Sequence, residues 1–350
     1  MDSRLTRTTG VTAALAIVLV GATAPAEIVL APGYHSRIIA TGQRPVTGME
    51  YNPVSDTWLG IEATGWDYIN EANRAGSIHP IADTFGLGGM WRDELAVAHN
   101  NLAWVAEPHY ADIYQLVPAT VGCVKRHIMQ LGGWTRQPAT EADYNGDLIV
   151  GFAEYDAIHA PADWYRITQA GSASLLFSTS DRAILWLERD KTTGTFYGID
   201  VYSSSGPVYW DRERPRLVTI DTSSGAITDI RQYDGFQLDD IEADRTHDIV
   251  ASDVLWAGQL VGTTYAIVPI DPITGDIGAA IATATDGWTI SSPCVAPSSD
   301  DPMVMSLYAQ VGLGTGEVHV IEIIPEPTTL ALLALGGVAL LRRRLRTATR

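Results

Sequence analysis

The stretch LVTIDTSSGAITDI, residues 217–230, contains two runs of alternating apolar and polar residues joined by a turn with Gly225. Such alternation is typical of a strand with one face in a core. A tight turn needs a residue at positive φ, and glycine adopts that conformation without a Cβ clash. The stretch therefore predicts an antiparallel β-hairpin.

This hairpin pattern recurs along the chain, at residues 67–81, 112–128, 164–177 and 265–281. Its turn glycines lie 46, 49, 54 and 50 residues apart, at Gly76, Gly122, Gly171, Gly225 and Gly275. A second hairpin precedes each copy, as in LAVAHNNLAWVA, and a sixth such hairpin, VAPSSDDPMVMSL, follows the last copy. The sequence thus contains six repeats of four strands, the sixth incomplete.

Four strands repeated every 40–55 residues are typical of a β-propeller blade. The sixth repeat supplies only three strands and ends at residues 317–323. A missing outer strand would leave an unpaired edge, and residues 34–42, YHSRIIATG, form a strand with no partner of their own. We therefore predict an all-β, six-bladed β-propeller whose N-terminal strand closes the last blade. A seven-bladed ring and a two-domain β-sandwich are the alternatives.

Tryptophans are spread through the repeats, which favours packing between neighbouring blades over a single platform for stacking sugars. The repeats also resemble, loosely, exported bacterial propellers with a Tyr-x-Ile-Asp-x-x-Thr-Gly pattern. That resemblance supports the fold and implies no activity.

The first 26 residues have the pattern of a secretory signal peptide. Arg4 and Arg7 precede an apolar run over Val11–Ala22, and Ala24-Pro25-Ala26 follows as a small-residue cleavage site. We expect cleavage after Ala26 and export of the remainder.

The last 26 residues, PEPTTLALLALGGVALLRRRLRTATR, combine a Pro-Glu-Pro, an apolar run over 328–341 and an arginine cluster. A 14-residue helix reaches about 21 Å, less than the roughly 30 Å hydrocarbon core of a bilayer. The arginines suit a cytoplasmic flank. One interpretation of such a tail is an ordinary membrane anchor, and the other is a signal that is recognised for sorting and then removed. The motif residues are Pro325, Glu326, Pro327, Arg342, Arg343 and Arg344.

This tripartite tail resembles the PEP-CTERM sorting signal, in which a short hydrophobic helix separates Pro-Glu-Pro from terminal arginines. The resemblance implies recognition by an exosortase-type protease, transient inner-membrane insertion through 328–341 as a transmembrane helix, and cleavage near Pro325–Pro327. It also implies delivery to the cell envelope, outer surface or extracellular matrix of a Gram-negative-type bacterium that makes exopolysaccharide. The expected organisation is a signal peptide at 1–26, a propeller at 27–324 and a sorting signal at 325–350.

The expected mature body is strongly acidic. Seven of the 23 basic and two of the 41 acidic residues lie in the two ends, which leaves 16 against 39 and a net charge of −23. Such a charge excludes nucleic-acid binding and favours cations. The two cysteines, Cys123 and Cys294, could pair, and the sequence leaves this open.

A candidate calcium loop lies in DYNGDLIVGFAE. Asp143, Asn145, Asp147 and Glu154 occupy positions 1, 3, 5 and 12 of such a loop, which would supply oxygen ligands to a hard cation. Leu148 stands where the loop requires glycine, however, and Asn-Gly is a common hairpin-turn pair. The alternative is therefore a plain turn that leads directly into a strand.

Glutamate ends the first strand in four of the six repeats, at Glu50, Glu141, Glu188 and Glu242, with Val97 and Val295 at the other two positions. First strands line the channel of a propeller, so these residues predict an acidic ring that attracts cations. Repulsion within the ring would raise carboxyl pKa values. The alternative places the four glutamates at solvated strand ends.

The sequence contains no GxSxG, HExxH or phosphate-binding loop. We therefore expect an exported, non-catalytic propeller that binds extracellular polysaccharide or a surface protein. The alternative is a secreted hydrolase or lyase whose active site lies in the funnel and uses a divalent cation.

Overall fold

The computed structural model describes residues 28–62, 68–83, 94–107, 111–131, 136–154, 162–202, 214–250, 252–285, 287–313 and 316–326. The predicted signal peptide and the predicted sorting helix, with its arginines, lie outside these residues. In the described part of the chain every regular element is a β-strand.

The first three blades are four-stranded antiparallel sheets formed by consecutive strands. Blade 1 contains β3 (Thr47–Asn52), β4 (Thr57–Ile61), β5 (Tyr68–Asn73) and β6 (Ile78–Asp83). Blade 2 contains β7 (Glu94–Ala98), β8 (Leu102–Glu107), β9 (Asp112–Val117) and β10 (Val124–Gln130). Blade 3 contains β11 (Arg136–Ala142), β12 (Leu148–Glu154), β13 (Ala162–Ile167) and β14 (Ala173–Thr179).

The remaining blades continue the order, and the last two recruit strands from the N-terminus. Blade 4 contains β15 (Ile184–Arg189), β16 (Phe196–Asp200), β17 (Arg216–Asp221) and β18 (Ala226–Gln232). Blade 5 contains β19 (Gln237–Asp244), β20 (Val254–Val261), β21 (Thr264–Ile270), β22 (Ala282–Ala284) and β1 (Ile28–Leu30). Blade 6 contains β23 (Trp288–Pro297), β24 (Met305–Leu313), β25 (Val318–Pro325) and β2 (Tyr34–Gly42).

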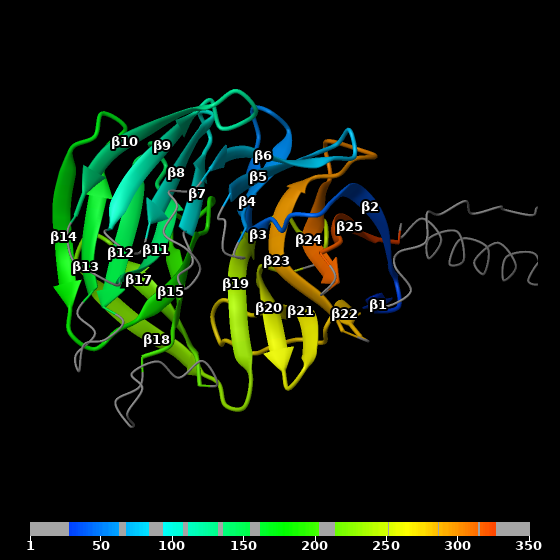
Figure 1. Cartoon of the computed structure of the whole chain (residues 1–350). Coiled ribbons are helices and arrows are strands. Elements are labelled where there is room, and N and C mark those ends of the chain that lie inside the picture. The colour runs from blue at the N-terminus through cyan, green and yellow to red at the C-terminus, as the bar shows by residue number, and fades with distance from the viewer. Residues whose placement is uncertain are drawn as a thin grey trace, which may run out of the picture.

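The six sheets form a ring (Figure 1), which confirms the predicted six-bladed propeller. The first strand of each blade contacts the first strands of both neighbouring blades, so β3, β7, β11, β15, β19 and β23 surround a central channel. The predicted closure is also confirmed. β2 pairs antiparallel with β25 from Tyr34 opposite Pro325 to Gly42 opposite Val318, and Figure 1 shows the two strands side by side.

The hairpin turns between third and fourth strands have the predicted glycine conformation. All five turn glycines adopt positive φ, between +71° and +98°: Gly76, Gly122, Gly171, Gly225 and Gly275. In blade 5 the strand after the turn differs from expectation, because β22 begins at Ala282 instead of within residues 276–281. Pro269 in β21 has no amide hydrogen to donate to a neighbouring strand. The Gly278 amide donates to the Pro269 carbonyl and the Ile281 amide to the Ile267 carbonyl, so residues 278–281 contact β21 without forming a strand.

Neighbouring blades are held together by apolar side chains. Buried clusters join blades 1 and 2, blades 2 and 3, blades 3 to 5, blades 5 and 6, and blades 6 and 1. Four tryptophans are completely buried in these clusters, as expected from their spread through the repeats: Trp58, Trp104, Trp164 and Trp256. Burial of such side chains stabilises the ring by roughly 2–3 kcal/mol each.

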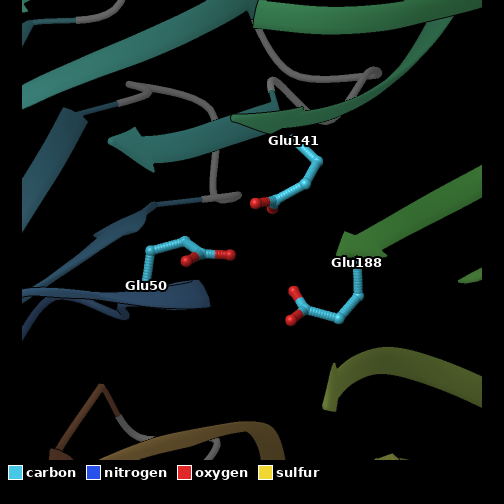
Figure 2. Close-up of side chains that lie close together, drawn as sticks. All are labelled: Glu50, Glu141 and Glu188. Atoms are coloured by element: carbon cyan, nitrogen blue, oxygen red, sulfur yellow. The ribbon is translucent and has the colours of Figure 1, made fainter. Parts of the chain in front are cut away.

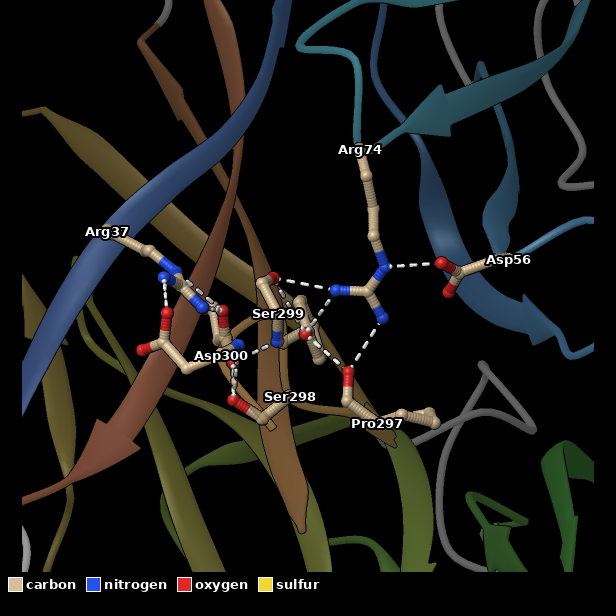
Figure 3. Close-up of polar contacts among 9 residues, drawn as sticks. Arg37, Asp56, Arg74, Pro297, Ser298, Ser299 and Asp300 are labelled. Atoms are coloured by element: carbon tan, nitrogen blue, oxygen red, sulfur yellow. Dashed lines mark hydrogen bonds and ion pairs between the residues drawn. The ribbon is translucent and has the colours of Figure 1, made fainter. Parts of the chain in front are cut away.

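Polar contacts fix the strand that closes the ring (Figure 3). In β2, Arg37 donates from Nε to Glu322 Oε2 at 2.7 Å and from Nη1 to Asp300 Oδ1 at 2.5 Å. The other oxygen of Glu322 accepts from Ser298 Oγ at 2.8 Å and from the Ser299 amide at 3.1 Å. Burial by itself raises the pKa of Glu322, but these hydrogen bonds from Ser298, Arg37 and Ser299 bring it below its ordinary value.

The seam between blades 1 and 6 is held by Arg74, which follows β5 (Figure 3). Its guanidinium donates to Asp56 Oδ2 at 2.7 Å within blade 1. It also donates to the Pro297 carbonyl at 2.7 Å and to Ser299 Oγ at 2.6 Å in blade 6. The guanidinium lies 5.0 Å from the centre of the Trp58 ring. One side chain therefore connects the first and last blades.

We predict that Glu322→Gln destabilises the protein by about 2 kcal/mol at pH 7, because it removes the negative partner of Arg37 from a buried site. A carboxyl whose pKa is lowered by folding stabilises the fold above its ordinary pKa of 4.5 and loses that effect as the pH falls through the lower folded value. The difference between the two proteins should therefore shrink below about pH 4. Urea unfolding at pH 7 and pH 3.5 measures it.

The matched control is Asp234→Asn, which neutralises an exposed acid in the turn before β19. It should leave the free energy of unfolding almost unchanged at both pH values. Equal destabilisation by the two variants would contradict a specific role for Glu322 in closure.

Candidate functional site

Closure of the ring brings together glutamates from distant parts of the chain. Glu50, Glu141, Glu188 and Glu242 lie in β3, β11, β15 and β19, the first strands of blades 1, 3, 4 and 5. One carboxylate oxygen from each of Glu50, Glu141 and Glu188 lies within 4.8 Å of the other two, and Figure 2 shows the three side chains pointing toward one another. Glu141, Glu188 and Glu242 are almost completely buried. The structure therefore brings Glu50, Glu141 and Glu188 together and buries Glu141, Glu188 and Glu242, while the acidic ring that attracts cations stays a prediction.

Burial and mutual repulsion make these carboxyl groups weaker acids than an ordinary glutamate. Burial, followed by the charges of other channel glutamates, raises the pKa of Glu50 and Glu188 well above the ordinary value. Burial raises the pKa of Glu141 to about 8, although Lys191 and Arg189 oppose the change. The pKa of Glu242 is also raised by burial, against the effect of Lys191. The cluster therefore favours any species that supplies positive charge.

Lys191 reaches this cluster from the turn between β15 and β16. Its Nζ lies 3.8 Å from Glu242 Oε1, and its side chain is 58% exposed. The charge of Glu242 is the main reason that the pKa of Lys191 lies well above its ordinary value. Lys191 is therefore a charged group at the mouth of the channel, in contact with both solvent and Glu242.

A cavity of about 580 Å³ lies at this mouth and reaches Glu141 and Glu242. The ends of the first strands and the turns that follow them supply its lining, apart from Met305 at the start of β24. The lining mixes rings with charged groups, among them Tyr51, His99, Tyr144, Arg189, Lys191 and Arg245. Tyr144 is 78% exposed, and its ring centre lies 6.4 Å from that of His99.

Our sequence analysis did not identify these mouth residues as candidates. They show no motif, but Tyr51, His99 and Tyr144 each follow the glutamate or valine position of a first strand by one to three residues. Alignment of the repeats could therefore have found them. The described tryptophans named above are buried between blades and do not form a platform at the mouth.

The candidate calcium residues form a hairpin turn. Asp143 Oδ1 accepts from the amides of Asn145 and Asp147 at 2.7 and 3.1 Å, and its Oδ2 lies 3.0 Å from Nη2 of Arg166. Asp147 Oδ1 accepts from the Gln169 amide at 3.1 Å. Residues 148–154 form strand β12, which carries Glu154 about 20 Å along the sheet. These contacts favour the turn over a 12-residue calcium loop, and calcium binding by Asp143, Asn145 and Asp147 remains an untested prediction.

The predicted sorting motif begins at the end of the closing pair. Pro325 is the last residue of β25, opposite Tyr34, and the Glu326 amide donates to the Gly33 carbonyl at 2.7 Å. Pro327 and the arginines lie outside the described residues, as does 328–341. Among the residues that the structure covers, no helix has the length and apolar character needed to cross a membrane.

The two cysteines do not pair with each other. Cys294 is buried in β23, and Cys123 lies before β10 in blade 2; both are free thiols. The Cys123 thiol donates to the Ile81 carbonyl at 3.3 Å. The described residues therefore hold no bridge between these repeats.

Comparison with known proteins identifies the tail. Residues 324–345 match the PEP-CTERM protein-sorting motif. This confirms the resemblance found in the sequence and indicates an exported bacterial protein that is sorted to the cell surface and processed by an exosortase. No curated protein gives a significant match to the chain.

Similar solved structures support the fold. A gluconolactonase from Xanthomonas campestris has a TM-score of 0.55 at 11% identity, over 84% of this chain and 91% of that one. The PQQ-bound aldose sugar dehydrogenase of Streptomyces coelicolor has the same TM-score and identity, over 84% and 100%. The calcium structure of a Trichoderma reesei enzyme of carbohydrate-active family AA12 has a TM-score of 0.50 at 12% identity, over 84% and 96%. At these identities the likeness concerns the fold alone.

We predict that Lys191→Met destabilises the cation-free protein by roughly 1 kcal/mol, because the buried glutamates lose a neighbouring positive charge. Glu242→Gln in the same chain should recover part of this loss, since it removes the carboxylate that Lys191 neutralises. Urea unfolding of the single and double variants at pH 7.5 in EDTA gives the coupling energy.

The matched control uses the only other lysine of the chain, Lys125, which lies on outer strand β10. Lys125→Met removes the same charge far from the first strands. If both lysine variants lose the same stability, or if Glu242→Gln does not recover any, the predicted role of Lys191 is wrong.

Proposed function

We propose that this protein is a non-catalytic binding protein of the bacterial cell surface, whose channel mouth binds extracellular polysaccharide. The sorting motif supports the location. The cavity supports the binding role, because rings and charged side chains from five different blades meet there. We further propose that the bacterium is of Gram-negative type and that the mature protein lies in its envelope or extracellular matrix.

The single observation that carries the binding proposal is the composition of the mouth. A volume of about 580 Å³ lies in the range of small-molecule sites and could hold a few sugar units. Exposed rings such as Tyr144 offer apolar faces for sugar C–H groups, while Arg189 and Arg245 offer hydrogen-bond donors. A channel lined by aliphatic residues alone would not favour this type of ligand.

The alternative proposal is a secreted hydrolase or lyase that uses the same cavity. Buried carboxyl groups with raised pKa values beside a cavity are typical of active sites. Structures with this fold include a gluconolactonase and an aldose sugar dehydrogenase. A divalent cation in the channel would suit this alternative as well.

We predict that Tyr144→Ala weakens binding of exopolysaccharide oligomers about tenfold, because stacking on an aromatic ring contributes roughly 1 kcal/mol or more. Tyr144→Phe should bind normally, since it keeps the ring. Isothermal titration with size-fractionated oligomers measures the affinity, and product analysis of the same mixtures detects turnover.

Ile273→Ala serves as the control, because Ile273 is 85% exposed and lies on the turn after β21, away from the cavity lining. Equal weakening by Tyr144→Ala and Ile273→Ala would contradict a site at the mouth. Release of shortened or modified products would contradict the binding role and favour the enzyme.

For the tail, we predict that replacing Arg342, Arg343 and Arg344 with Gln blocks normal processing, because the apolar segment loses its cytoplasmic charge anchor. Full-length precursor should accumulate in the native host. The same should follow from deletion of the exosortase. Immunoblots of cell fractions and mass spectrometry of the C-terminal peptide measure this, with Arg350→Gln as control. Normal trimming in cells without exosortase would contradict the proposal.

A further inference from the structure

The channel concentrates negative charge that nearby basic residues do not neutralise. Glu50, Glu141 and Glu188 converge from three blades, with ligand oxygens within 4.8 Å of one another. In the described part of the chain Lys191 pairs with Glu242, and no basic side chain lies within ion-pair distance of the other three glutamates. Three carboxylates at this spacing, two of them buried, repel one another strongly unless protons or a cation intervene.

A second observation concerns the hydrogen-bonding state of Glu141. This side chain is 3% exposed, and its Oε2 atom is buried without a hydrogen-bond partner. Figure 2 shows its carboxylate directed at Glu50 and Glu188. Buried oxygens almost always have a partner, so an unpartnered one aimed at two further carboxylates is the arrangement expected of a cation ligand.

We propose that Glu50, Glu141 and Glu188 bind one hard divalent cation, and that this cation is calcium. Three points no more than 4.8 Å apart leave a position at most about 2.8 Å from all three oxygens. Calcium takes oxygen ligands at 2.3–2.6 Å, whereas magnesium requires 2.0–2.1 Å. Calcium also accepts irregular coordination, whereas magnesium requires a near-ideal octahedron, so three carboxylates from three different strands suit calcium better.

The cavity gives this site a route for exchange. Glu141 is part of the cavity lining, so a cation can reach the cluster from the channel mouth. Three carboxylates also leave coordination positions free for water or for oxygens of a ligand in the cavity. The cation site stands on the channel geometry, and it does not depend on the polysaccharide proposal.

Lys191 sits beside the proposed site and competes electrostatically with the cation. Its ammonium group is attracted to Glu242, the fourth glutamate, at 3.8 Å. Removal of this charge should strengthen cation binding, whereas removal of a ligand should weaken it. The two types of variant thus have opposite expected effects on the same measured affinity.

The test is a titration of the purified full-length protein with calcium chloride at pH 7.5, after EDTA treatment and desalting. We expect one calcium ion per chain. Glu141→Gln and Glu188→Gln should each weaken binding roughly tenfold or more, because each removes one charged ligand. Lys191→Met should tighten binding roughly threefold. Far-UV circular dichroism checks that each variant keeps the β-fold.

Two control variants distinguish calcium binding at this site from calcium binding elsewhere on the protein. Asp234→Asn removes an exposed charge outside the channel and should not change the affinity. Asp143→Asn keeps the turn oxygen that accepts the backbone amides but alters the candidate calcium loop, and it should also have no effect. Absence of stoichiometric binding would overturn the proposal. So would loss of binding in Asp143→Asn with normal binding in Glu141→Gln, or tighter binding of magnesium than of calcium.

Discussion

The antiparallel pairing of β2 with β25 is the constraint on which the rest of the structure depends. It gives blade 6 its outer strand and removes the edge that three strands would expose. The pair joins residues almost 300 positions apart, so its formation fixes the ends of the propeller together. Arg37 and Glu322 strengthen this register, because their charges meet in a site where Glu322 is inaccessible to solvent.

Closure also creates the channel and its chemistry. Only the complete ring brings Glu50 of blade 1 beside Glu141 and Glu188 of blades 3 and 4. The burial of these groups opposes folding, whereas the apolar clusters between blades favour it. Functional sites are a common place for an arrangement that opposes folding in this way.

The sorting motif begins at the end of the strand pair that closes the ring. β25 ends at Pro325, the first residue of Pro-Glu-Pro, and the Glu326 amide is still bonded to the N-terminal segment. The motif therefore follows the sheet without an intervening linker.

The sequence by itself determined the repeat, the number of blades, the closing strand and the C-terminal sorting motif, whereas the N-terminal signal peptide stays a prediction. These features are local: alternation has a period of two, turn glycines recur at fixed intervals, and charge order along a tail needs no tertiary contact. The recurrence of glutamate at the end of the first strand could also be recognised from the sequence, because equivalent positions of the repeats face the same channel. Only the tertiary structure decided that Asp143 belongs to a turn, that Lys191 reaches Glu242, and that Tyr51, His99 and Tyr144 surround one cavity. Those relations join side chains from different blades or depend on hydrogen bonds within a turn, and residue spacing in one chain does not encode such distances.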